Sequence, residues 1–85
     1  MNANNSTLEA LVLAADRAES ILDAATLARD EARRAYYARN DANSTAVYEA
    51  LVRADVARDE AIKAHRIASD AVFAFFDAER VFPAL

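Results

Sequence analysis

Small and apolar residues recur every three or four positions along most of this chain, which is the spacing of one face of an α-helix. In the second half, alanine returns every seven residues without a slip, at Ala50, Ala57, Ala64, Ala71 and Ala78. Three residues before each of these alanines lies another small or apolar residue: Val47, Ala54, Ala61, Ala68 and Phe75. This heptad pattern predicts a long helix that packs closely along its whole length.

The first half has the same alternation of three and four, at Leu11, Ala14, Ala18, Ile21, Ala25, Ala28, Ala32 and Ala35. Turn-forming residues cluster at 40–45, where Asn40 suits a left-handed helix stop and Ser44 or Thr45 suits the next helix cap. Ser6 and Glu9 fit a capping box, and Pro83 fits the end of a helix. The sequence predicts a polar lead-in over 1–6 and one hairpin domain over 7–85, with helices at 7–39 and 46–81 joined by a loop at 40–45.

The two predicted helices match each other as an antiparallel pair, because their inward residues meet in order around the loop. Leu11 lies opposite Phe75 in this arrangement, and Ala25 lies opposite Ala61. Facing alanines let two helix axes approach to about 8 Å. The predicted fold class is therefore all-α: an antiparallel two-helix hairpin with the character of an alanine-seamed coiled coil.

Larger side chains must lie outside a seam that is filled by alanine, and many of them share one flank of the predicted hairpin. These residues are Leu22, Tyr36, Tyr48, Leu51, Ile62, Val72 and Phe76. An apolar flank of this size exceeds what a small monomer usually exposes. We therefore expect a homodimer that forms a four-helix bundle through this self-association face.

Composition narrows the choice of partners. The chain has 85 residues, a formal charge of -4, no cysteine and no glycine. A net negative charge disfavours binding to nucleic acid or to an anionic membrane and favours a basic protein. Without glycine, the chain lacks the usual phosphate-binding loops. No apolar run is long enough to span a membrane and no signal peptide is recognisable, so we expect a cytoplasmic protein.

The candidate chemistry is sparse. The nearest pairing of glutamate and histidine, Glu60 and His65, has a spacing of five, whereas carboxylate-bridged metal sites in helical bundles use a spacing of three. No set of Ser, His and Asp is brought together by the predicted helices. We therefore expect no enzymatic activity, no catalytic residue, no metal site and no cofactor.

One polar cluster stands out, because Arg29, Arg58 and His65 fall near the middle of the predicted apolar flank, with Arg33 close by. Buried or half-buried arginines are usually paired with an acceptor. One interpretation is structural, with Asp55 or carboxylates of a second copy as the acceptors. The other is functional, with these four residues binding an anion, a nucleotide or an acidic partner.

Three functions are compatible with these features. The first is a stoichiometric protein binder, an adaptor or inhibitor of a host or partner protein of the kind that phages and mobile elements encode. The second is a nucleotide or RNA binder that uses Arg29, Arg58 and His65, and the third is a self-assembling structural component. The two-helix layout is similar to that of the small RNA-binding hairpin dimers of plasmids, although the chain carries no family's motif residues.

Overall fold

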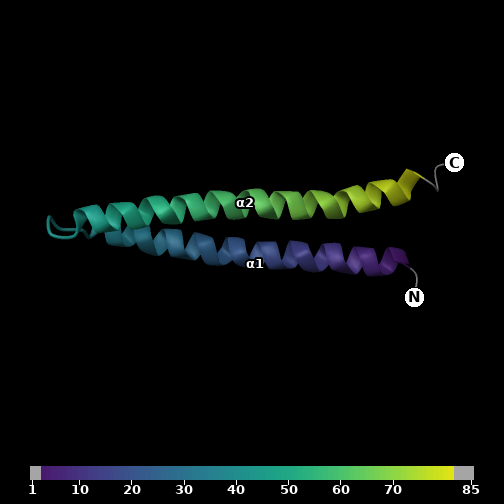
Figure 1. The fold of residues 1–85 in the computed structure, drawn as a ribbon, viewed down its shortest axis with the longest axis horizontal. Helices are drawn as coiled ribbons and strands as arrows, with labels where there is room; N and C mark the ends of the chain where they lie inside the picture. Colours follow the sequence, from purple (N-terminus) through teal and green to yellow (C-terminus); the bar gives the residue numbers. More distant parts are fainter. Residues whose placement is uncertain (1–2, 82–85) are drawn as a thin grey trace.

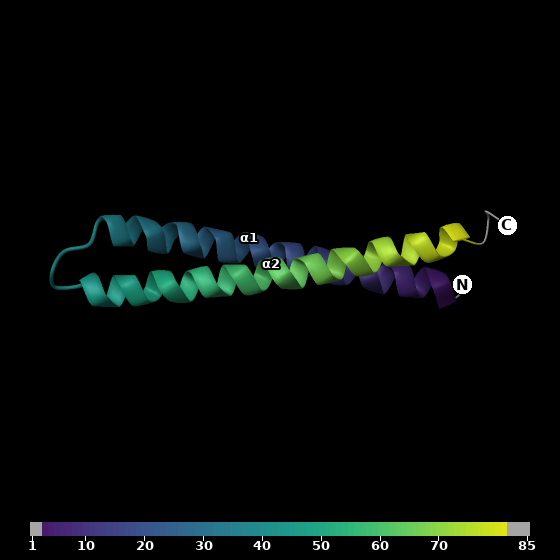
Figure 2. The same cartoon turned by 90° about the horizontal axis from the view of Figure 1, so that it is seen from above.

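The computed structural model describes residues 3–81, with side chains described within 6–78. Two helices, α1 (Ala3–Tyr37) and α2 (Ser44–Val81), lie side by side and run in opposite directions (Figure 1). Seen from above, they cross each other at a shallow angle (Figure 2). The molecule is a rod with extents of 67 × 23 × 13 Å. The all-α antiparallel hairpin predicted from the sequence is confirmed.

The helix ends differ slightly from the prediction. α1 begins at Ala3 rather than at residue 7, so residues 3–6 are helical instead of forming a polar lead-in. Neither glycine nor proline interrupts this stretch, so the helix can continue through its less favourable asparagines. α1 ends at Tyr37, two residues earlier than residue 39, and α2 begins at Ser44 rather than at residue 46. The stop expected at Pro83 lies outside the described residues.

The loop of residues 38–43 is held by side chains rather than by a left-handed residue. Asn40 Oδ1 accepts hydrogen bonds from the amides of Ala42 at 3.0 Å and Asn43 at 3.1 Å. The amide of Asn40 donates in turn to Asn43 Oδ1 at 2.9 Å. The left-handed stop predicted at Asn40 is wrong, because no described residue has a positive φ. Its side chain closes the turn instead, as short polar side chains often do.

Asn40→Ala should therefore destabilise the hairpin by about 1 kcal/mol, which is typical for the loss of a capping side chain. The expected fall in melting temperature is about 4–8 °C for a chain of this size. Thermal unfolding followed by circular dichroism measures the change. The control is Asp41→Ala, an exposed position in the same loop. Equal melting temperatures for the two variants would contradict the role of Asn40.

The helices meet along a regular stripe of less exposed positions, which we call the inner stripe. In α1 it consists of Leu8, Leu11, Ala15, Ala18, Leu22, Ala25, Arg29, Ala32 and Tyr36. In α2 it consists of Val47, Leu51, Ala54, Arg58, Ala61, His65, Ala68, Val72 and Phe75. Both series alternate spacings of three and four, as expected for coiled-coil packing. Within residues 6–78, Ala61 alone is fully buried, with 5% of its surface exposed.

Six of the fourteen alanines predicted for the seam are confirmed, because the inner stripe contains Ala18, Ala25, Ala32, Ala54, Ala61 and Ala68. Six others are wrong, because Ala14, Ala28, Ala35, Ala57, Ala64 and Ala78 are exposed, and Ile21 is 61% exposed. Ala50 and Ala71 are half-buried at its edge. Each helix is rotated so that larger side chains, such as Leu22 and Leu51, turn inward. Burial stabilises in proportion to apolar area, so these side chains displace alanine from part of the seam.

Candidate functional site

The polar cluster predicted near the middle of the rod lies in the inner stripe, between the two helices of one chain. Arg58 Nε donates a hydrogen bond to Thr26 Oγ1 across the hairpin at 3.1 Å. Arg29 Nη2 pairs with Asp30 Oδ1 at 3.3 Å, and the Arg29 side chain is only 20% exposed. Among the described residues, Arg29 Nε is a buried donor without a hydrogen-bond partner. Both arginines are half-buried, as is common for long side chains whose stems can lie along apolar surface.

The other members of the predicted cluster are less closely involved. His65 lies two helical turns from Arg58, and its Nε2 is 3.5 Å from the Ser69 hydroxyl on the same helix. Arg33 is exposed, as is Asp55, the acid expected to serve as an acceptor. The structure therefore brings Arg29 and Arg58 into one polar layer with Thr26 and Asp30. His65 forms a separate contact, and Arg33 lies at the surface.

The self-association face predicted from the sequence is divided between the interior and the surface. Leu22, Tyr36, Leu51 and Val72 belong to the inner stripe and are half-buried within a single chain. Tyr48 and Phe76 are exposed, and Ile62 is half-buried beside the stripe. Tyr36 contacts Tyr48 across the hairpin, with ring centroids 6.2 Å apart. The face that a second copy would need is therefore smaller than the sequence predicted, and homodimerisation stays a prediction.

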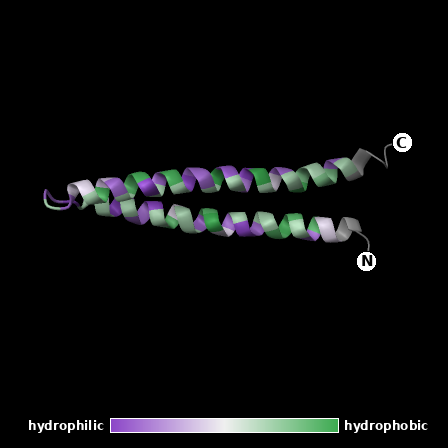
Figure 3. Cartoon of the chain, viewed as in Figure 1, coloured by the Kyte–Doolittle hydropathy of each residue, from purple (hydrophilic) through white to green (hydrophobic). Residues whose placement is uncertain are grey.

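The hairpin has two open sides that differ in chemistry. We call one of them the groove side, because a shallow groove of about 250 Å³ opens there between the helices. It is lined by Val12, Ala15, Asp16, Ser69, Val72 and Phe73. We call the opposite side the alanine side, since it carries Ala14, Ala28, Ala35, Ala57, Ala64 and Ala78. Figure 3 shows that hydrophobic and hydrophilic residues are interspersed along both helices rather than separated by helix.

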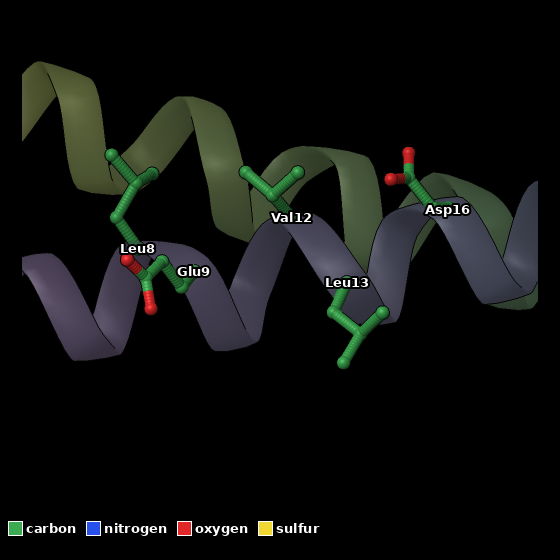
Figure 4. A pocket seen from close by; sticks show the side chains of 5 residues that line it. All are labelled: Leu8, Glu9, Val12, Leu13 and Asp16. Carbon is green, nitrogen blue, oxygen red and sulfur yellow. The ribbon is translucent and has the colours of Figure 1, made fainter.

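A second hollow, of about 390 Å³, continues the groove side toward the start of α1. Figure 4 shows Leu8 and Val12 pointing toward α2 and Asp16 on the same side, while Leu13 points away. Glu9 also lines this hollow. Phe73, at 67% exposed, stands on the α2 edge of the groove. The terminal end of the groove side is therefore an apolar strip with carboxylates along its α1 edge.

Charge is distributed unequally between the two sides. Among residues 6–78, helical spacing places seven carboxylates on the groove side, namely Glu9, Asp16, Glu19, Asp23, Asp30, Asp55 and Asp59. Four arginines of the same range lie on or reach that side: Arg29, Arg33, Arg58 and Arg66. The alanine side carries two acids and two bases, Glu31, Glu60, Arg17 and Arg53. The acidic excess of the described side chains is therefore concentrated beside the groove.

Sequence reasoning did not identify the carboxylates as a group, although their spacing contained a signal. Glu9, Asp16, Asp23 and Asp30 recur every seven residues, in the same period as the alanines of the second helix. A seven-residue period keeps side chains on one face of a helix. Recognising the row required knowing which face of α1 packs against α2, and that face is set by the rotation of the helices.

The described residues include no group of three or more His, Asp or Glu side chains placed to hold a metal ion. No helix in the described part of the chain is both apolar enough and long enough to cross a bilayer. Comparisons with protein-family models, curated proteins and solved structures gave no match. The class that the fold and site define is an acidic helical hairpin with a charged, partly apolar groove.

Proposed function

We propose that this chain is a protein-interaction module, a small acidic helical hairpin that binds a partner protein stoichiometrically and thereby recruits or inhibits it. The observation that carries the proposal is the contrast between a very small core and a large exposed apolar surface. Ala61 is the one fully buried residue within 6–78. Val52 and Phe73 are meanwhile exposed on one face of α2, and Ile67 is exposed on another. Exposed apolar surface of this kind marks interaction sites.

The total surface supports the same proposal. The chain exposes 6403 Å² of solvent-accessible surface. A compact monomer of about this mass exposes roughly 5,000 Å². The excess of roughly 1,400 Å² is larger than the roughly 800 Å² that each partner buries in a stable protein complex. The hairpin therefore has enough spare surface to bury a complete interface without unfolding.

Anion or RNA binding through Arg29, Arg58 and His65 has weaker support. Arg58 already donates to Thr26, and Arg29 already pairs with Asp30. The surrounding side carries seven described carboxylates against four arginines, and this net negative charge would repel a phosphate group. The arginines serve better as the polar part of the helix interface, and the geometry favours a protein partner over an anionic ligand.

Affinity capture with two matched variants tests the proposal. Phe73→Ser and Ile67→Ser each remove one large exposed apolar side chain from α2, at 67% and 71% exposed, on the groove side and the alanine side respectively. We expect wild-type chain to retain a protein in stoichiometric amounts and one variant to lose it with helix content unchanged. Retention of the same proteins in the same amounts by wild type and both variants would contradict the proposal.

A further inference from the structure

We infer that the groove side binds a cationic amphipathic α-helix of a partner protein, which lies along the hairpin as a third helix with a basic residue every seven positions. This inference rests on the proposed function and specifies the partner's chemistry. Three observations support it: a periodic row of carboxylates, the absence of basic partners for most of that row among the described side chains, and the apolar groove beside it.

The row consists of Glu9, Asp16, Asp23 and Asp30 on α1. Successive members are about 10.5 Å apart along the axis, because a helix rises about 1.5 Å per residue. A helix packed alongside α1 at a shallow angle repeats its own side chains at the same interval. Lysines or arginines spaced by seven residues on that helix would therefore meet the carboxylates one by one.

Among the side chains that the structure describes, most of the row has no basic partner. Asp30 pairs with Arg29. Glu9, Asp16 and Asp23 have no lysine or arginine three or four residues away, where a helix would pair them. Within residues 6–78, whose side chains the structure describes, no ion pair to any of these three is present. Three unpaired charges in line beside an apolar groove are available for electrostatic complementarity with a partner.

The groove supplies the apolar part of the contact. Val12 and Ala15 from α1 line it together with Val72 and Phe73 from α2. Amphipathic helices dock by laying an apolar face into such a groove, with charged residues at the rim. A third helix would cover Phe73, which is 67% exposed in the isolated chain. The occupant is therefore a helix with apolar residues on one face and basic residues at its edge.

Charge disfavours two other occupants. A second copy of this chain would present the same side, on which the described carboxylates outnumber the arginines by seven to four, and like net charges at an interface oppose association. An anionic lipid surface would be repelled by the seven carboxylates on this side. A basic helix satisfies both the charge and the apolar surface, and it is the occupant that we propose.

The test uses synthetic helical peptides as probes. The first probe is an amphipathic Leu/Lys peptide with leucine at the heptad core positions and lysine at the flanking positions. The second replaces every lysine by glutamate, and the third has the composition of the first in shuffled order. Fluorescence anisotropy measures binding to the full chain at low and moderate salt. We expect the first peptide to bind at least about tenfold more tightly than the other two, corresponding to about 1.4 kcal/mol.

Matched variants locate the contact on the hairpin. The row variant Asp16→Asn/Asp23→Asn should weaken binding about five- to tenfold, since it removes two ion pairs at the rim of the contact. The control Asp70→Asn/Asp77→Asn makes the same charge change at two exposed positions with the same spacing on α2. It should weaken binding less than about twofold. Phe73→Ser should weaken binding about tenfold, whereas Ile67→Ser should not.

If the two asparagine variants weakened peptide binding equally, the loss of affinity would be explained by net charge alone, and the inference would be overturned. So would equally tight binding of the shuffled peptide, or sedimentation that shows the chain pairing with itself through Phe73. The affinity-capture experiment separates this failure from failure of the proposed function. If capture of the partner protein is lost in Ile67→Ser and not in Phe73→Ser, the chain remains an interaction module and the groove is the wrong site. If it depends on neither, both proposals fail.

Discussion

Replacing Ala61 with leucine is expected to destabilise the hairpin by about 2 kcal/mol, within the range for overpacked interiors. The expected fall in melting temperature is about 8–16 °C for a chain of this size. Ala61 is the one fully buried residue within 6–78, and Ala25 lies in the same layer of the opposite helix. Extra methylenes at this position would force the helix axes apart and loosen the neighbouring alanine layers.

The matched control is Ala64→Leu, three residues further along the same helix. Ala64 is exposed, although the sequence alone placed it in the same seam as Ala61. Leucine and alanine both favour the helix, so this change should cost less than about 0.5 kcal/mol. Urea unfolding followed by circular dichroism compares the two variants. Similar losses of stability at both positions would show that the helices are rotated as the sequence suggested, with both alanines inside.

Leu51→Ala is expected to cost about 2 kcal/mol, near the lower end for leucine truncation because the side chain is half-buried. Leu51 lies in the inner stripe, where it contributes apolar area within a single chain. The sequence had assigned it to a self-association face instead. If it packs within the hairpin, the loss of stability should be the same at low and high protein concentration.

Leu27→Ala is the control for this second prediction, because Leu27 is 58% exposed on α1. It should change the free energy of unfolding by less than about 0.5 kcal/mol. Chemical unfolding at several protein concentrations, with sedimentation equilibrium in parallel, measures both variants. If the cost of Leu51→Ala appeared only at concentrations where the chain is a dimer, Leu51 would belong to an interface between copies.

The polar layer explains how arginine is accommodated in a helix interface. In a two-helix hairpin each helix has one neighbour, so an inner position is never far from water. Arg29 and Arg58 can therefore cover apolar surface with their stems and still reach Asp30 and Thr26. Larger bundles would bury these charges more fully and would need better-matched partners. Any third helix should therefore pack beside the polar layer and leave it accessible to water.

Local signals in the sequence were sufficient to predict two long helices and the site of the turn. The heptad period and the absence of glycine and proline before Pro83 define the helices. Asn40 and Asn43 mark the turn, although the way Asn40 closes it, by side-chain acceptance rather than a left-handed backbone, was not predictable from residue type. Both conformations are open to asparagine.

By itself, the sequence determined an all-α antiparallel hairpin, because helix period and chain connectivity allow few other ways to bury the small residues. Only the tertiary structure decided which way each helix is rotated. Two overlapping stripes compete for the inside: an alanine stripe that permits the closest approach, and a stripe containing Leu22, Leu51 and Val72 that buries more apolar area. The second supplies half of the inner positions. That rotation exposes the remaining alanines and aligns Glu9, Asp16 and Asp23 beside the groove.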